Sequence, residues 1–246
     1  MELHGKVALI TGGTRMGEAV AQALGSRGSR VLLTWRRSRE AAEKTVAVLQ
    51  ARGVTASALR CDLSQPASIQ QTVRLIGSKF GRLDVLVNLA SIYERSPSVE
   101  KDLSGSWDTH LAANARSAYL LTLAVARLMK RSGGGRVVHI SDWTSASGRP
   151  RYQEYSSYYV SKAAVKAVTE TLALELAPSI LVNAIAPGPI LPPQGLTAKE
   201  DKAVRRATPL GRWGGAEEIA KAALFLIETD FVTGETLRVD GGRHLY

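Results

Sequence analysis

Short apolar runs alternate with longer stretches of helical period along the whole chain. The short runs have the length and apolar content of buried strands, and the longer stretches repeat apolar residues every three or four positions, which is typical of helices. The predicted strands are residues 7–10, 31–33, 56–59, 85–87, 137–140, 180–185 and 236–239. The predicted helices pass through Ala19, Ala23 and Leu24 and cover residues 41–49, 69–76, 111–129, 158–176, 197–206 and 219–227.

This alternation predicts an α/β fold, namely a Rossmann-like doubly wound parallel sheet flanked by helices on both faces. No internal repeat and no linker-like change in composition interrupts the pattern, so we expect one domain over residues 1–246. The stretch from about 187 to 215 is rich in proline and glycine. Long loops within compact domains are usually functional, and we expect this one to be a substrate loop.

Composition narrows the class of protein. The chain has 246 residues, of which 45% are apolar and 22% charged, as in ordinary globular proteins. A single cysteine, Cys61, excludes a disulfide framework and favours the cytoplasm. The four histidines are scattered, and no metal is predicted. Residues 176–198 are uncharged, but five prolines exclude a membrane-spanning helix, and the amino end does not resemble a secretory signal.

The net charge of +10 could attract nucleic acid or an anionic cofactor. The arginines are dispersed, however, in short pairs such as Arg36-Arg37 and Arg205-Arg206. This pattern favours a solvated basic surface, so we expect a small-molecule substrate and neither a nucleic-acid nor a membrane partner.

A glycine-rich turn, Thr11-Gly-Gly-Thr-Arg-Met-Gly17, separates the first predicted strand from the first helix. Glycines in this position let the backbone approach a pyrophosphate, whose charge then meets the helix N-terminus. Such a turn is common, but its place after the first strand favours a dinucleotide site. The cofactor-binding residues expected here are Gly12, Thr14, Arg15, Met16 and Gly17.

The end of the second strand indicates which dinucleotide binds. An NAD-specific protein usually has an acidic residue there, whereas this chain has Arg36, Arg37 and Ser38, with no acid before Glu40. Arginines suit a 2′-phosphate through charge-assisted hydrogen bonds, so the pattern favours NADP(H). The alternative is that both arginines are merely exposed at a helix start. Arg15 could reach the same phosphate or the substrate.

Two further strand ends are expected to contact the cofactor. Asp62, followed by Leu63, is placed after the third strand to accept from the adenine amino group. Asp62 could also be the N-cap of the helix that follows, and both roles can hold. Asn88, Ala90 and Ser91 end the fourth strand, where the cofactor ribose should pass.

Tyr158 and Lys162 are four residues apart and therefore share one face of a helix. An ammonium group near a phenol favours phenolate and is expected to lower the pKa of Tyr158 from about 10 toward working pH. The pair would then donate a proton beside a hydride acceptor. On spacing alone the pattern also fits an ordinary helix start, and Tyr155 and Tyr159 compete with Tyr158.

Order and position together resemble the short-chain dehydrogenase/reductase family over the whole chain. The matching features are the early Thr-Gly turn, residues 88–91, Asn114 in a long helix, Tyr158 with Lys162, residues 183–188 and residues 239–242. The resemblance implies that Tyr158 protonates the substrate, that Lys162 holds the nicotinamide ribose and tunes Tyr158, and that Asn114 anchors a proton-relay water. It also implies that Pro187, Gly188 and Ile190 lie beside the nicotinamide.

The resemblance further implies a homo-oligomer, most simply a tetramer. Members of the family commonly pair their two long helices, here near 111–129 and 158–176, across a two-fold axis. The second helix has small residues that permit close approach, namely Ala163, Ala164, Ala167 and Ala173. The alternative is that these alanines pack only on the sheet.

One departure from the family pattern indicates the substrate. The usual catalytic serine is Asp142, and an ionised aspartate would repel the alkoxide that a serine hydroxyl stabilises. Aspartate instead suits a substrate with N–H donors or a nitrogen that must be protonated. This feature resembles the pteridine reductases and the dihydromonapterin (dihydrofolate) reductases. Arg15-Met-Gly17, Arg37-Ser38, residues 88–93 and residues 240–245 resemble the same subgroup.

In that subgroup an aromatic residue stacks the pterin ring against the nicotinamide, a role that the resemblance assigns to Tyr93. The substrate-binding residues are then Arg15, Ser91, Tyr93, Asp142 and Tyr158. Two lengths differ from the family pattern: the first loop has one residue fewer between Gly12 and Gly17, and the segment from Asp142 to Tyr158 is a few residues longer. Asp142 could alternatively be only a cap or loop residue.

The expected function is therefore NADPH-dependent reduction of a pterin or folate ring. The alternative is an NADPH-dependent carbonyl reductase, such as a 3-oxoacyl-[acyl-carrier-protein] reductase, which fits the fold but leaves Asp142, Arg15 and Tyr93 unexplained. A third reading is a cofactor-sensing or basic nucleic-acid-binding protein on the same fold. The complete set of Asn114, Tyr158 and Lys162 argues against that reading.

Overall fold

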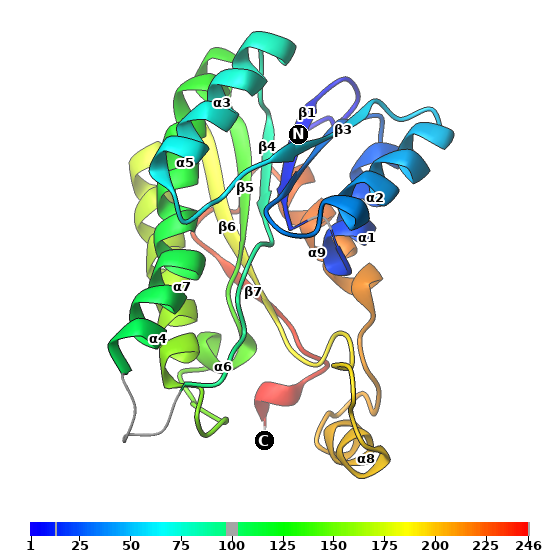
Figure 1. Ribbon diagram of the computed structural model, residues 1–246, viewed down its shortest axis with the longest axis vertical. Helices are drawn as coiled ribbons and strands as arrows, with labels where there is room; N and C mark the ends of the chain where they lie inside the picture. Colours follow the sequence, from blue (N-terminus) through cyan, green and yellow to red (C-terminus); the bar gives the residue numbers. More distant parts are fainter. Residues whose placement is uncertain (13, 97–102, 246) are drawn as a thin grey trace.

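A seven-stranded parallel sheet forms the centre of the molecule, in a computed structural model that describes residues 1–12, 14–96 and 103–245 (Figure 1). The strand order is β3-β2-β1-β4-β5-β6-β7, and every neighbouring pair is parallel. The strands are β1 Val7–Thr11, β2 Arg30–Trp35, β3 Ala56–Arg60, β4 Val85–Asn88, β5 Gly135–Ile140, β6 Ile180–Pro187 and β7 Thr236–Val239. The predicted doubly wound α/β fold is confirmed.

Helices cover both faces of the sheet, as Figure 1 shows. One face is covered by α1 Met16–Ser26, α2 Arg39–Ala51 and α9 Ala216–Glu228, and the other by α3 Pro66–Phe80, α5 Ser117–Arg131 and α7 Ser156–Leu176. Alternate side chains of β1 point to opposite faces, so Ile10 packs in one hydrophobic cluster and Leu9 in the other. Burial on both faces explains why the strands read as continuous apolar runs.

The long helix before β5 is interrupted by a different backbone geometry. It begins as α4 Leu103–His110, passes through a π-helix (η1, Leu111–Arg116) and continues as α5. π-helical turns are rare and often mark functional sites, and this one contains Asn114. The apolar period predicts a helix here but not this change of hydrogen bonding. The short helices α6 Trp143–Ala146 and η2 Arg243–Leu245 are likewise not predicted by the sequence pattern.

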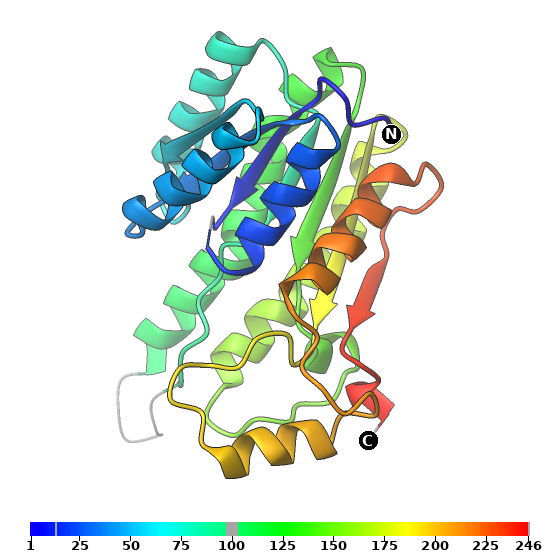
Figure 2. The same cartoon turned by 90° about the vertical axis from the view of Figure 1, so that its right-hand side faces the viewer.

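The strand order reverses between β1 and β4, so the connections leave these two strands in opposite directions. In sheets of this kind the reversal opens a crevice at the carboxyl ends of the strands. The segment after β6 crosses this end of the sheet and contains α8 Ala198–Arg206, as Figure 2 shows. A capping box between Thr197 and Glu200 fixes the start of α8. The predicted substrate loop therefore lies beside the crevice.

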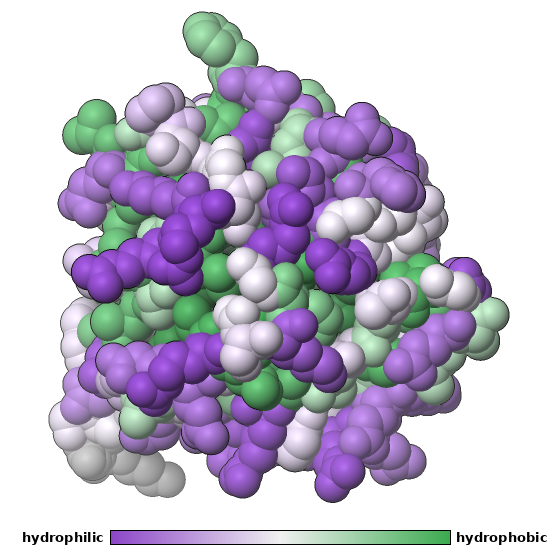
Figure 3. All heavy atoms as spheres, turned by 90° about the horizontal axis from the view of Figure 1, so that it is seen from above, coloured by the Kyte–Doolittle hydropathy of each residue, from purple (hydrophilic) through white to green (hydrophobic). Residues whose placement is uncertain are grey.

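The opposite end of the molecule carries hydrophilic side chains spread among hydrophobic ones, as Figure 3 shows. Within the described residues, no helix is both long enough and apolar enough to cross a bilayer. In the same part of the chain, no three His, Cys, Asp or Glu residues are grouped so that they could hold a metal ion.

Candidate active site

A cleft of about 760 Å³ opens at the carboxyl ends of the strands. Most of the predicted site residues line it, although they come from segments far apart in the sequence. They are Gly12, Thr14, Arg15, Met16, Gly17, Arg36, Arg37, Ser38, Asp62, Leu63, Ala90, Ser91, Tyr93, Asp142, Tyr158, Lys162, Pro187, Gly188 and Ile190. Asn88 and Asn114 are not among the lining residues, and both are buried.

Three glycines shape one half of the cleft because a side chain at their positions would collide with its surroundings. A Cβ on Gly17 would lie 1.9 Å from the carbonyl oxygen of Gly12, and one on Gly12 would lie 3.1 Å from the amide nitrogen of Ala90. A Cβ on Gly188 would lie 2.5 Å from the Cβ of Asp240. Gly13 of the same turn lies outside the described residues. The turn therefore places bare backbone at the N-terminus of α1, where a pyrophosphate can be bound.

The end of β2 presents cationic side chains to the cleft. Arg36 and Arg37 are both exposed, and Ser38 occupies the N-cap position of α2 without a side-chain capping bond. Arg36 Nη1 lies 3.8 Å from Asp62 Oδ1, across the gap between the ends of β2 and β3. An anion at this corner would meet two guanidinium groups in water-accessible surroundings.

Asp62 makes a local turn and does not cap a helix. Its Oδ1 accepts from the backbone amide of Ser64 at 3.0 Å and from the Ser64 hydroxyl at 2.7 Å. The Ser64 hydroxyl bond lowers the pKa of Asp62, and the charge of Arg36 adds to this. The N-cap of α3 is Gln65, so the helix-cap interpretation of Asp62 is wrong. A helix capped by Asp62 would begin at residue 63. Instead α3 begins three residues later, at Pro66, and the turn at Asp62 precedes it.

Asn88 links the ends of β1 and β4 instead of lining the cleft. The Thr11 hydroxyl donates to Asn88 Oδ1 at 2.6 Å, and the amide of Ala90 donates to the same hydroxyl at 3.0 Å. These bonds fix where the chain leaves β4. Asn88 therefore acts on the cleft through the position of Ala90 and Ser91.

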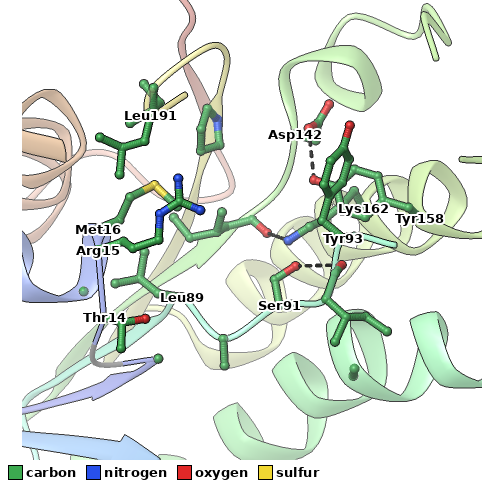
Figure 4. Close-up of a pocket in the computed structure, with 18 of the residues that line it drawn as sticks. Thr14, Arg15, Met16, Leu89, Ser91, Tyr93, Asp142, Tyr158, Lys162 and Leu191 are labelled. Carbon is green, nitrogen blue, oxygen red and sulfur yellow. Dashed lines mark hydrogen bonds between the residues drawn. The ribbon is translucent and has the colours of Figure 1, made fainter. Parts of the chain in front are cut away.

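Tyr158 and Asp142 meet at the opposite half of the cleft, as Figure 4 shows. The Tyr158 hydroxyl donates to Asp142 Oδ2 at 3.1 Å. The other oxygen, Oδ1, accepts from the amide of Thr144 at 2.8 Å and thereby caps α6. Asp142 therefore both caps α6 and contacts Tyr158, because each contact uses a different carboxylate oxygen. The longer segment between the two residues does not separate them.

The expected lowering of the Tyr158 pKa is wrong for this structure. Burial, followed by the charge of Asp142, raises the pKa of Tyr158 well above its usual value. The Lys162 ammonium donates to the Ile140 carbonyl at 2.8 Å and lies 5.8 Å from the centre of the Tyr158 ring. Burial also lowers the pKa of Lys162 to about 8, against the opposing charge of Asp142. Tyr158 consequently keeps its proton and is a donor, not a phenolate.

Asn114 lies in the π-helix, and its side chain makes four hydrogen bonds to residues outside that helix. Its Oδ1 accepts from the amide of Ile92 at 2.9 Å and from the Ser91 hydroxyl at 3.1 Å. Its Nδ2 donates to the Ile92 carbonyl at 3.1 Å and to the Ser161 hydroxyl at 2.9 Å. The side chain thus joins the segment after β4 to α7, one turn from Tyr158.

Tyr93 lies next to Tyr158 at the cleft, as Figure 4 shows, and is about half exposed. Its ring stacks on Tyr155 with centroids 4.6 Å apart and meets Tyr158 edge-on at 4.7 Å. Tyr155 is not among the lining residues, whereas Tyr93 is. Tyr155 therefore supports Tyr93 from outside the cleft, and the contact was not expected from the sequence.

Arg15 lies across the cleft from Tyr158, next to Leu191, as Figure 4 shows. Its backbone has a positive φ of 54°, a conformation that few residues other than glycine adopt. Its Nη2 donates to the carbonyl of Pro192 at 3.5 Å. Arg15 thus joins the first glycine turn to the predicted substrate loop.

Several lining residues were missed by sequence reasoning. The largest are Trp35, Trp143, Trp213, Tyr152 and Arg243. Arg243 lies 5.8 Å from the Trp143 ring, so the C-terminal η2 contacts the helix that Asp142 caps. Trp143 directly follows Asp142 in the sequence, which could have indicated it. Trp213 lies in the predicted substrate loop and Arg243 in the segment 240–245 that resembles the reductase subgroup, but neither residue was singled out from the sequence.

Known proteins resemble the chain along its whole length. The family model described as "Enoyl-(Acyl carrier protein) reductase" matches residues 13–244. The chain is 33% identical to the 3-oxoacyl-[acyl-carrier-protein] reductase FabG of Escherichia coli over the full length of both proteins. It is 37% identical to the granaticin polyketide synthase putative ketoacyl reductase 2 of Streptomyces violaceoruber, covering 97% of this chain and 96% of that one.

The fold is also similar to solved structures. A short-chain dehydrogenase/reductase from Serratia marcescens has a TM-score of 0.90 at 33% identity, covering 99% of this chain and 100% of that one. The seven-stranded sheet, the glycine turn after β1 and the Tyr158–Lys162 pair agree with these similarities. The chain therefore belongs to the short-chain dehydrogenase/reductase family of oxidoreductases.

Proposed function

We propose that this oxidoreductase is a reductase that uses NADP(H). Gly12, Gly17 and Gly188 line the cleft without side chains, and Arg36 and Arg37 provide the charge that a 2′-phosphate requires. By the family resemblance, Lys162 would hold the nicotinamide ribose, and Asp62 would accept a hydrogen bond from the adenine. Titration of the protein with NADPH and with NADH, followed by fluorescence, tests the proposal, and equal or tighter NADH binding would contradict it.

We further propose that the substrate is a pterin or folate ring in which a C=N bond is reduced. The observation that carries this proposal is the hydrogen bond from Tyr158 to Asp142, a carboxylate where ketone reductases have a hydroxyl. A carboxylate can only accept while it is ionised, so it suits ring N–H donors and disfavours a developing alkoxide.

Each residue then has a defined part in the reaction. The nicotinamide, when bound, supplies a hydride to a ring carbon of the substrate. Tyr158, which keeps its proton because it is buried beside Asp142, donates that proton to the adjacent ring nitrogen. The Lys162 ammonium, 5.8 Å from the centre of the Tyr158 ring, would offset part of the charge of the phenolate that remains. Asp142 orients the Tyr158 hydroxyl and accepts from the ring N–H groups, while Tyr93 stacks on the ring.

The names of the relatives favour a second candidate, reduction of a 3-oxoacyl thioester. FabG of Escherichia coli and the Streptomyces violaceoruber protein are both named as reductases of such groups, and no relative described above is named for pterins. A shared fold supports many substrates, so these names bear on the reaction type more than on the substrate. NADPH oxidation with dihydrobiopterin, dihydrofolate and an acetoacetyl thioester, compared side by side, decides between the two. Preference for the thioester would contradict the pterin proposal.

A homotetramer is our proposal for the assembly. Tyr119 and Leu123 on α5 and Leu174 on α7 are large apolar side chains that remain exposed on the two long helices. Of the small residues on α7, Ala167 is exposed, whereas Ala173 packs in the core and cannot contact a second copy. Light scattering at micromolar concentration tests the proposal, and a monomeric mass would contradict it.

A further inference from the structure

A second cavity lies beside the catalytic tyrosine, under the loop that joins α6 to α7. Its volume is about 350 Å³, and we call it the side cavity. The residues lining it are Thr144, Pro150, Arg151, Tyr152, Gln153, Glu154, Tyr155, Ser156, Tyr158, Tyr159 and Val160. All but Thr144 belong to the loop or the first turns of α7, so the loop that is longer than the family pattern builds most of the cavity.

The side cavity adjoins the catalytic cleft. Tyr152 and Tyr158 line both spaces, so the side cavity and the cleft meet at these two side chains. The Tyr152 hydroxyl accepts from Trp143 Nε1 at 3.3 Å, and the Tyr152 ring meets the rings of Trp143 and Tyr155 edge-on. A group that extends from a substrate held at Tyr158 toward Tyr152 would therefore point to the side cavity.

The loop over the side cavity is tied to the segment that carries Tyr93. The amide of Ser96 donates to the Glu154 carbonyl at 2.6 Å, and Arg95 Nη1 lies 3.5 Å from a Glu154 carboxylate oxygen. Stacking of Tyr93 on Tyr155 adds a third link. These three contacts hold the loop in place, so binding a group in the side cavity requires little further ordering of the chain.

The walls indicate what fits inside. They are mainly tyrosine rings with Pro150 and Val160, and the two charged residues, Arg151 and Glu154, are both exposed. Burying a charge without a partner is costly, so an uncharged group is favoured. Aromatic rings pack well against tyrosine edges and faces, and the volume lies within the range of about 300–1,000 Å³ that ligand pockets show.

We propose that the side cavity binds an aromatic substituent of the substrate and that Tyr152 positions this substituent relative to Tyr158. This proposal rests on the proposed function in one respect: the aromatic group in the side cavity belongs to a substrate that is reduced at Tyr158. It names the class of substrate: a reducible group at the cleft with an uncharged aryl group attached to it.

Pairs of substrates that differ only in the substituent test this inference. We expect kcat/KM for 6-phenyl-7,8-dihydropterin to exceed that for 6-methyl-7,8-dihydropterin at least tenfold, because burial of an aromatic ring contributes at least that factor. Benzoylacetyl and acetoacetyl thioesters form the corresponding pair for the second candidate function. If the protein turns over one of these pairs and the phenyl-to-methyl ratio of kcat/KM is near one, the inference is overturned.

Variants at one wall position provide matched controls. Val160→Phe fills the cavity and should reduce the phenyl-to-methyl ratio to about one without changing turnover of the methyl compound. Val160→Ala enlarges the same space and should keep or raise the ratio. Ser156→Phe fills the cavity from the exposed end of α7, and it serves if Val160→Phe does not fold. A ratio that survives both filling variants would contradict the inference.

A binding measurement separates this inference from the proposed function. If thioesters are turned over and pterins are not, the pterin proposal fails while the thioester pair still tests the side cavity. If neither class is turned over, the phenyl-bearing compounds should still raise the melting temperature of the wild type more than that of Val160→Phe. Equal shifts in the two proteins would overturn the inference on their own.

Discussion

The half of the cleft proposed to bind the cofactor (the cofactor half) and the half proposed to bind the substrate (the substrate half) are built in different ways. The cofactor half consists of strand ends and the turns that directly follow them, and its shape depends on backbone contacts such as that between Gly17 and the Gly12 carbonyl. The substrate half joins segments far apart in the sequence through side chains, as in the Tyr93–Tyr155 stack and the Tyr158–Asp142 bond. The first half therefore follows from local sequence, and the second from packing.

This difference implies different tolerance to change. A side chain at Gly17 or Gly188 has no room without a backbone shift, so the cofactor half admits few substitutions. The loop over the side cavity lies outside the sheet, so we expect changes to its side chains to leave the strands in place. Substrate specificity can then vary on a constant cofactor site, as is common for loops on a rigid scaffold.

The largest expected effect is at Tyr158 in the substrate half. Tyr158→Phe removes the proposed proton donor and keeps the ring, so turnover should fall by about 10²–10⁴-fold. NADPH binding should stay within about twofold, because the cofactor half is untouched. Single-turnover assays and an NADPH titration of the same protein measure the two effects. A variant that loses cofactor binding and turnover together would show that the two halves are not separable.

His139 joins the two helices that support the substrate half. It is fully buried in β5, between the hydroxyls of Thr122 on α5 at 2.9 Å and Thr169 on α7 at 3.1 Å. Burial, together with the charge of Lys162, lowers the pKa of His139 from 6.5 to about 4. The unfolded chain therefore binds more protons than the native one between these values, and the folded state loses stability as pH falls from about 6.5 to 4.

The shift corresponds to about 3 kcal/mol of unfolding free energy across that window. His139→Gln should lose less stability than the wild type between pH 7 and pH 4.5, although it is less stable at pH 7. Urea unfolding at both pH values measures the difference, and His4→Gln, at an exposed position, is the control. If the wild type and His139→Gln lose the same free energy of unfolding between the two pH values, the role of this residue is contradicted.

In the cofactor half, Arg37→Ala should weaken NADPH binding by about 1.5–3 kcal/mol, the contribution of a hydrogen bond to a charged group. NADH binding should change little, because that cofactor has no 2′-phosphate. Fluorescence titration with both cofactors gives the two affinities. Equal weakening of both would indicate that Arg37 shapes the loop and does not bind the phosphate.

The smallest effect is expected where one ring supports another. Tyr155→Ala removes the stack behind Tyr93, which is worth about 0.5–1.5 kcal/mol beyond area burial. We expect KM for the substrate to rise by less than about tenfold with kcat nearly unchanged, since the proton donor and cofactor remain. A fall in kcat alone would show that Tyr155 acts on Tyr158 instead of on Tyr93.

The sequence predicted the sheet, the strand ends and many of the residues that line the cleft there, because apolar period and glycine turns are local properties. It did not predict the π-helix at Asn114, whose four side-chain bonds come from segments distant in sequence. It also misjudged the pKa of Tyr158, because spacing places Lys162 on the same helix face but does not reveal burial or the nearer Asp142 carboxylate. The side cavity depends on how a loop packs, which spacing does not show.

Replacement of Asp142 tests the central claim most directly, since this carboxylate is what separates ring reduction from ketone reduction. For the wild type and Asp142→Ser, kcat/KM is measured with dihydrobiopterin and with an acetoacetyl thioester. We expect the substitution to lower the pterin value by about 10²–10⁴-fold and to preserve or raise the thioester value, because a hydroxyl can stabilise an alkoxide. Unchanged pterin reduction in Asp142→Ser, or a wild type that prefers the thioester, would contradict the account.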